Sequence, residues 1–449
     1  MSQQLMMSLL LILSVIVLLV LVMKVKLHAF LSLLIVSMLV GLLSGMPIDK
    51  IMTSMQKGMG GTLGFIATVI GLGAIFGKIL EVSGGAESLA YTLLKKFGEK
   101  NAPWAMALSG FLVSIPVFFD VGFIILVPIA YSLAKETKKS VLYYGIPLLA
   151  GLAVSHAFIP PTPGPVSVAA LVGANLGNVI KYGIIAGIPA AILAGPVWGK
   201  FIGKKILATV PESIQLDNEK LRGAKETKNL PNFFLVVFLI FIPIILILLN
   251  TSATTVLPDG MAKNVLTFIG HPFFALGLAD ILAFITLGLK RGMSTTQMLE
   301  ISNAAIIPTG MIILVTGAGG VYKQVLVDSG IGKILADGLA GSGMNVIVLS
   351  FAIALIVRIA AGSATVAMMT AGGIVAPLLA SSAVEPALIV IAIASGSTAM
   401  SHVNDSGFWL VNQYFGISEK DTLRSWTIME TIIGFVGLAV VLLLNLFVK

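Results

Sequence analysis

Long apolar runs, separated by short polar loops, dominate the chain. Runs of about 20 apolar residues are long enough to cross a bilayer. We therefore predict spans at 5–23, 27–45, 61–80, 141–160 and 179–198 in the first half, and at 231–250, 271–289, 303–322, 386–402 and 427–447 in the second. The first run has no basic leader and no A-x-A site, so we expect it to be retained. The composition is 57% hydrophobic and 11% charged, which also favours an all-α polytopic membrane protein over a soluble domain.

Two apolar stretches, 103–134 and 345–380, do not fit one crossing each. At about 1.5 Å per residue the first would form a helix roughly 48 Å long. That is too long for one crossing and too short for two crossings and a turn. Pro116 and Gly122 interrupt the first stretch, and Gly362 with Ser363 interrupts the second. We predict that both are re-entrant hairpins.

Basic residues concentrate in alternate loops. Nineteen of the 28 Lys and Arg residues lie in loops assigned to the inside, at 24–26, 95–100, 135–139, 199–228, 290–291 and 420–424. By the positive-inside rule this bias predicts five crossings per half and both termini outside. The net charge of +8 therefore reports topology and does not indicate nucleic acid. The chain divides into a first repeat at 1–198, a basic cytoplasmic linker at 199–230 and a second repeat at 231–449.

The two halves are related in sequence. The segment that begins at Gly71 resembles the one that begins at Gly317, with Ser83-Gly84 opposite Ser329-Gly330. At nearly the same offset, HAFIPPTPGP (156–165) lies opposite AMSHVNDSGF (399–408). An odd number of crossings per half makes the repeat inverted. We expect each half to hold a hairpin followed by a broken span, an arrangement that forms substrate sites in inverted-repeat transporters.

The polar segment SHVNDSG (401–407) is embedded in apolar sequence. Gly396 and Gly407 bracket it and are expected to loosen the helix there. Polar groups at membrane depth are tolerated only where they line a cavity or pack within protein. The segment therefore predicts a site built on a broken helix. The alternative is a polar loop between two spans.

Isolated charges in the hairpins are the strongest candidates for chemistry. Arg358 is predicted to clamp a carboxylate, helped by Gly362, Ser363 and Thr365, where small residues and hydroxyls let a ligand approach. The alternative is a structural ion pair with an acid such as Asp120. Asp120 itself lies at the tip of the first hairpin. An acid in an apolar setting suits a proton carrier. The alternative is a hairpin tip that merely reaches water.

The broken spans supply the other candidates. His156 and His402 are either proton relays or hydrogen-bonded core residues. Asn404, Asp405 and Ser406 suit a proton, a cation or substrate hydroxyls. Thr162 and Gly164, among the prolines of the 160–165 loop, leave backbone groups free for a polyhydroxylated ligand, and a rigid turn would look the same. Lys78, Glu81, Lys323 and Asp328 at span ends are predicted to be structural, and Asp280 has no assigned role.

The sequence lacks the motifs that mark other classes of function. The chain has no cysteine and four histidines, and it shows no glycine-rich phosphate loop. We therefore predict no cofactor and no metal site. An intramembrane enzyme would need a nucleophile–base set or a metal cluster, and a channel would need a repeated pore-lining ring. The pattern favours a transporter.

A set of motifs spread over nearly the whole chain resembles the gluconate permease (Gnt) family of the ion transporter superfamily. The motifs are GMPIDKI (45–51), GGTLG (60–64), FGKILEVSGGA (76–86), HAFIPPTPGP (156–165), ILAGPV (192–197), KQVLVDSG (323–330), RIAAGSATVA (358–367) and SHVNDSGFW (401–409). The resemblance implies a proton symporter that imports gluconate or a related sugar acid across the bacterial inner membrane.

The resemblance further implies a homodimer in which the spans at 5–45 and 231–289 form a scaffold, while the hairpins and broken spans move. The same family includes carriers of D-serine and of other sugar acids, so D-serine or another small carboxylate is the alternative substrate. Coupling to sodium in place of protons is a further alternative, because hydroxyls and free carbonyls of broken spans suit Na⁺ as well.

Overall fold

The computed structural model describes residues 3–210, 230–331 and 345–448. In the described parts of the first half the helices are α1 (Gln3–Met23), α2 (Ala29–Leu43), α3 (Ile48–Val82), α4 (Gly85–Phe97), α5 (Ala102–Val113), α6 (Phe119–Thr137), α7 (Leu142–Phe158), α8 (Pro163–Val172), α9 (Leu176–Ile192) and α10 (Trp198–Lys205). In the second half they are α12 (Phe233–Val256), α13 (Met261–Ile269), α14 (Pro272–Ala283), α15 (Thr295–Ile306), α16 (Thr309–Asp328), α18 (Val346–Ala361), α19 (Ala364–Val375), α20 (Pro386–Thr398), α21 (Ser406–Phe415), α22 (Glu419–Thr422) and α23 (Ile428–Leu444).

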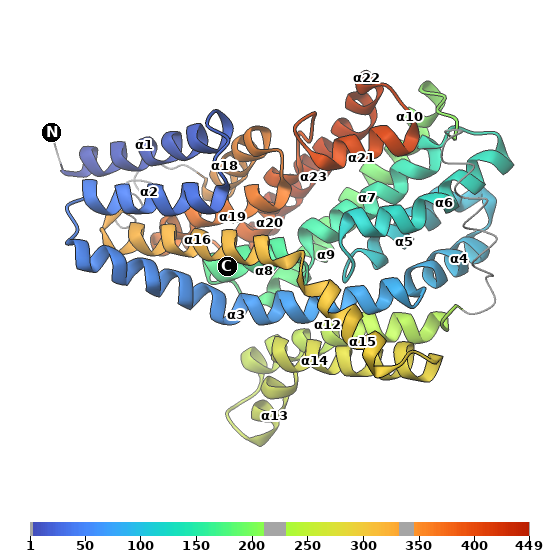
Figure 1. Cartoon of the computed structure of the whole chain (residues 1–449), viewed down its shortest axis with the longest axis horizontal. Coiled ribbons are helices and arrows are strands. Elements are labelled where there is room, and N and C mark those ends of the chain that lie inside the picture. The colour runs from blue at the N-terminus through green and yellow to red at the C-terminus, as the bar shows by residue number, and fades with distance from the viewer. Residues whose placement is uncertain (1–2, 211–229, 332–344, 449) are drawn as a thin grey trace.

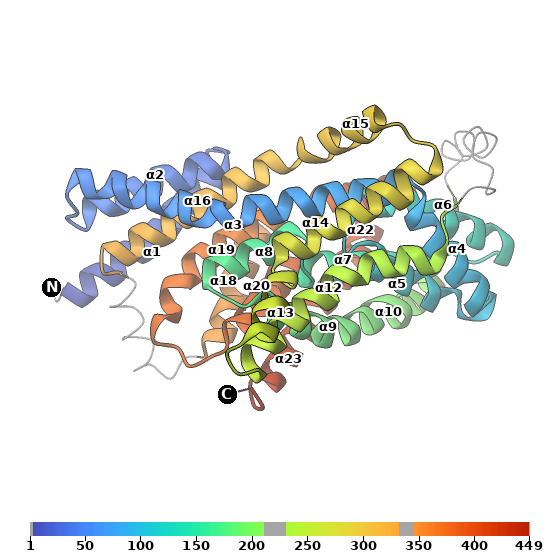
Figure 2. The same ribbon diagram turned by 90° about the horizontal axis from the view of Figure 1, so that it is seen from below.

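The predicted all-α membrane fold is confirmed. Within the described residues, seven helical stretches are long and apolar enough to cross a membrane. The long helix α3 runs along much of the molecule, with α16 beside it, in both Figure 1 and Figure 2. Helices α1 and α2 pack with α16 around a small separate core, while α12 and α14 belong to the main core.

The element order is similar in the two halves. In each half a helical hairpin (α5–α6, α18–α19) precedes a broken helix (α7–α8, α20–α21). Each half then ends in a helix that contains one π-helical turn, Leu193–Val197 before α10 and Leu423–Thr427 before α23. This order agrees with a two-repeat architecture. The inverted relation between the halves stays a prediction.

Three predictions about helix boundaries were wrong. Gly122 does not break the first hairpin: it lies within α6, packed where a Cβ would meet Leu152, and the turn falls at 114–118. Gly396 likewise lies within α20, in close contact with the backbone of Phe351, so the helix stays intact to Thr398. Small residues at these points serve close helix packing.

The third correction concerns helix length. The span predicted at 303–322 is split at Pro308 into α15 and α16, because proline lacks the N–H that would continue the helix. The start of the predicted linker, 199–205, is helical and belongs to α10, and the assignment of 199–230 as a cytoplasmic linker stays a prediction. Most of the rest of the predicted linker (211–229) lies outside the described residues.

Candidate functional site

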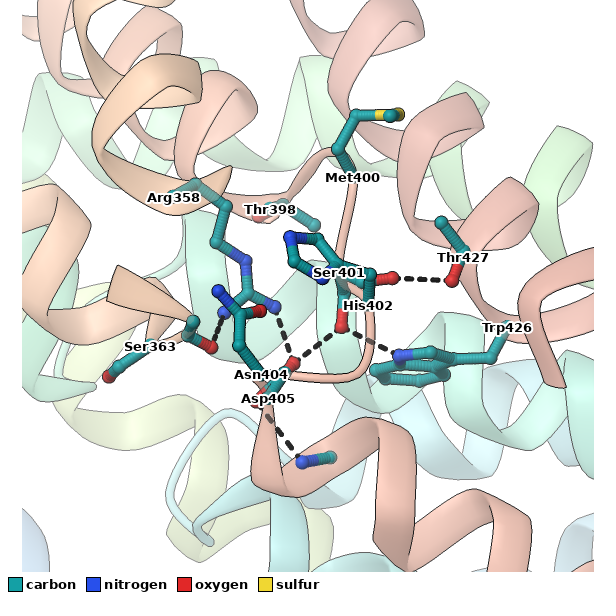
Figure 3. Close-up of polar contacts among 12 residues, drawn as sticks. Arg358, Ser363, Thr398, Met400, Ser401, His402, Asn404, Asp405, Trp426 and Thr427 are labelled. Atoms are coloured by element: carbon teal, nitrogen blue, oxygen red, sulfur yellow. Dashed lines mark hydrogen bonds and ion pairs between the residues drawn. The ribbon is translucent and has the colours of Figure 1, made fainter. Parts of the chain in front are cut away.

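The break between α20 and α21 forms the polar centre of the structure (Figure 3). Helix α20 ends at Thr398, and Met400 adopts a left-handed backbone conformation with φ 58°. The chain re-enters a helix at Ser406, where the Asp405 side chain caps α21 by accepting a hydrogen bond from the Gly407 N–H at 3.1 Å. The predicted break at this segment is thus present, and it starts after Thr398.

Arg358 is paired within the protein. Its guanidinium is 2% exposed, and Nη2 lies 2.5 Å from Oδ2 of Asp405. Its Nη1 donates to the carbonyl of Gly362, where the hairpin turns with φ 76°. A cation in the last turn of α18 is also favoured by the helix dipole. The acid that Arg358 meets is therefore Asp405 from the broken helix, and not Asp120.

Ser401 links this ion pair to the last helix (Figure 3). Its hydroxyl donates to Asp405 Oδ2 at 2.5 Å and accepts from the Trp426 indole N–H at 2.7 Å. Thr427 donates to the Ser401 carbonyl at 2.5 Å. Trp426 and Thr427 both belong to the π-helical turn, a type of irregularity that recurs at functional sites. The network fixes the orientation of the Asp405 carboxylate.

Asn404 and His402 tie the broken helix to the second hairpin. The Asn404 amide donates to the Ile359 carbonyl at 2.8 Å, and His402 Nε2 lies 3.1 Å from the same oxygen. The last carbonyls of a helix have no partner within it, so these side chains satisfy the end of α18. Neither residue lines the cavity described next.

A cavity of about 250 Å³ lies against the ion pair. Both hairpins and both broken helices contribute to its wall, together with α16 and α23. Among the predicted site residues, those that line the cavity are Asp120, His156, Arg358, Ser363, Thr365, Asp405 and Ser406. The structure thus brings together residues that are up to 286 positions apart in the sequence.

The remaining predicted site residues lie beside the cavity. Gly362 faces the backbone of Asn404, and Gly164 lies against Met368. The Thr162 hydroxyl donates to the Ile159 carbonyl at 2.6 Å within its own turn, and the residue borders a small hollow next to α3. Pro163 of the same loop does line the cavity.

Three of the four charged residues predicted to be structural, Lys78, Glu81 and Asp328, have polar partners within the protein. Lys78 and Glu81 form an ion pair at 2.6 Å. Asp328 accepts from Ser54 at 2.7 Å and from Gln324 at 2.9 Å. Asp280 lies on α14, away from the cavity, and its carboxylate oxygens have no hydrogen-bond partner in the described structure.

Three polar residues of the cavity wall were missed in the sequence: Glu430, Trp426 and Thr398. Glu430 is 4% exposed and belongs to α23. A single acid within the apolar run 427–447 is the same signal that singled out Asp120, so it could have been found. Trp426 and Thr398 lie at the ends of predicted spans, where aromatic and hydroxyl residues are common and carry little information.

Buried helices around a polar cavity, with broken backbone at its wall, define a membrane transporter. The comparison with known proteins gives the family. The model of the GntP family permeases matches residues 6–447, and the chain belongs to this family. It is a multi-pass protein of the bacterial inner membrane.

Similar curated proteins are named for sugar acids. The chain is 44% identical to the low-affinity gluconate transporter of Escherichia coli K12, over 94% of this chain and 95% of the relative. It is 43% identical to the gluconate permease of Bacillus subtilis 168, covering 95% and 97%. The Gnt-II system L-idonate transporter of Escherichia coli K12 is 38% identical, with 94% of each chain covered.

Among solved structures, MtrF of Neisseria gonorrhoeae has a similar fold. The TM-score is 0.66 at 15% identity, over 90% of this chain and 86% of that one. At this identity the likeness bears on the fold alone.

Proposed function

We propose that the protein imports gluconate or a closely related sugar acid by proton symport. The observation that carries the proposal is a buried arginine at the wall of a cavity enclosed by both hairpins and both broken helices. The relatives named for gluconate and L-idonate support the substrate class. A carboxylate is the group that a guanidinium binds in a forked geometry.

The cavity wall suggests how the substrate lies. Arg358, with the hydroxyls of Ser363 and Thr365, binds the carboxylate. Ser406 and Asp405 face the substrate hydroxyls. Gly362, Asn404, Thr162 and Gly164 lie one layer behind the wall, and they reach the substrate only when the loops rearrange.

The same cavity holds groups that carry protons. Asp120 lines it from α6 and His156 from α7, and His402 lies behind the wall on the broken helix. We assign proton coupling to Asp120 with His156 or His402. A homodimer with α1–α2 and α12–α14 as its scaffold belongs to the same proposal.

A competition panel tests the substrate class. Liposomes that contain the purified protein are loaded with gluconate, and the uptake of labelled gluconate by exchange is measured. Unlabelled gluconate, L-idonate or D-serine is added outside as the competitor. Strong competition by the sugar acids and weak competition by D-serine is the expected result. Stronger competition by D-serine would replace the substrate with a small amino acid in the same fold.

A further inference from the structure

Glu430 places a second, deeply buried carboxyl group at the cavity wall. It is the third residue of α23 and lies just past the π-helical turn that holds Ser401. The residue is 4% exposed, and its Oε1 has no hydrogen-bond partner in the described parts of the chain. A carboxylate in such a place is costly unless a proton or a cation compensates it.

Acidic side chains outnumber basic ones at the wall of the cavity. In the described structure its titratable wall residues are Asp120 from α6, His156 from α7, Arg358 from α18, Asp405 before α21, and Glu430. The helices packed on α23 include α7, α9, α18 and α20. The titratable residues that these four helices contribute to the described cavity wall are Arg358 and His156. One guanidinium therefore stands against three carboxyl groups.

Two nitrogens of the single guanidinium are already engaged, while its Nε has no hydrogen-bond partner among the described residues. Its Nη2 is held by Asp405 and its Nη1 by the Gly362 carbonyl. An incoming carboxylate must share Arg358 with Asp405, which adds a negative charge to a wall that already has an excess of them. Removing one partner from a buried ion pair leaves an uncompensated charge. Entry of the anion therefore requires that another carboxyl group become neutral.

The exposed fractions of the acidic side chains indicate which carboxyl group becomes neutral. Asp120 is the more exposed of the two remaining acids, whereas Glu430 is buried on the same cavity wall as the ion pair, so water screens the charge of Glu430 less. We propose that Glu430 takes up the proton that accompanies the substrate anion. Its carboxylate accepts a proton from the side to which the cavity opens, and gives it up on the other side when the anion leaves. The inference rests on the proposed sugar-acid symport. It replaces Asp120, with His156 or His402, by Glu430 as the group that binds the proton accompanying the anion.

Binding of gluconate to purified protein at pH 6 and pH 8 tests the link. If one proton accompanies the anion, the affinity of the native protein falls by at least about tenfold between these values. In Glu430→Gln the side chain is permanently neutral, so the affinity should vary less than about twofold over the same range. Glu385→Gln is the matched control: this acid directly precedes α20, accepts a hydrogen bond from the Asn178 amide at 3.0 Å and does not line the cavity. It should keep the native pH dependence.

A chemical readout on the native protein covers the case in which the variant does not fold. A hydrophobic carbodiimide reacts with buried protonated carboxyl groups, and mass spectrometry locates the adduct. Adducts at Glu430 should decline from pH 6 to pH 8. A native-like pH dependence in Glu430→Gln, or labelling that does not decline, would overturn the assignment and leave the transport proposal standing. Failure of the native protein to bind gluconate at either pH would overturn both.

Discussion

Lone charges in apolar sequence mark most of the candidate site. Arg358 and Asp120 stand out because each interrupts a long apolar run, and both line the cavity. The partner of Arg358 could not be predicted in the same way. Asp405 lies 47 residues further along the chain, and only the packing of α18 against the broken helix brings the two together.

Substitution of Arg358 by lysine tests whether the site needs the planar guanidinium group or only a positive charge. Removing the cation altogether would leave Asp405 buried and unpaired, at a cost of about 3–5 kcal/mol. Lysine keeps the charge but has no planar fork, so it cannot hold Asp405, the Gly362 carbonyl and a substrate at once. We expect Arg358→Lys to raise the KM for gluconate uptake by roughly tenfold or more, about 1.4 kcal/mol.

The control for this prediction is Arg424→Lys, on an exposed arginine that does not line the cavity. It should leave the KM unchanged. A native KM in Arg358→Lys would mean that the guanidinium serves only the ion pair with Asp405.

At the scale of elements, the sequence predicted the interruptions better than their positions. The hairpin turn at Gly362-Ser363 and the loops between α7 and α8 and between α20 and α21 are where the polar and proline-rich residues placed them. The predictions that Gly122 and Gly396 interrupt helices were wrong. A glycine that ends a helix and a glycine that lets two helices approach cannot be told apart in a single sequence. No sequence pattern described above predicted the π-helical turns.

Gly362→Ala tests how the second hairpin meets the broken helix. Gly362 has φ 76°, and a Cβ there would collide with the carbonyl of Asn404. The left-handed conformation alone costs an alanine about 1–2 kcal/mol. We expect the variant to lower the melting temperature and to abolish most gluconate uptake, because the turn that holds Arg358 and the segment that holds Asp405 must move apart.

Gly173→Ala is the matched control. Gly173 has a similar φ of 73°, with no atom within 4 Å of the added carbon. It should share the modest loss of stability and retain uptake. Equal effects of the two substitutions on uptake would show that contact between the hairpin and the broken helix is not required.

At the scale of the whole molecule, apolar run lengths predicted an all-helical membrane protein because the bilayer constrains element length so strongly. The length of α3, 35 residues, was not predictable from hydropathy, since its first part is polar enough to resemble a loop. The packing of α1 and α2 on α16, and of α14 on α3, follows from tertiary contacts that no local pattern encodes.

The absence of cysteine from the sequence makes the predicted topology directly testable. A single cysteine at Lys138 should react with a membrane-impermeant maleimide only after the cells are permeabilised, because the positive-inside rule places this loop in the cytoplasm. A cysteine at Asp259, in the loop between α12 and α13, should react in intact cells. Labelling of both from the same side would contradict five crossings per half.

Proton movement that accompanies gluconate is the most direct test of the central claim. Purified protein is placed in sodium-free liposomes that contain a pH-sensitive dye, and gluconate is added outside. The account predicts that the interior acidifies in step with the entry of labelled gluconate. Gluconate entry without acidification, or entry only when sodium is supplied, would contradict proton symport.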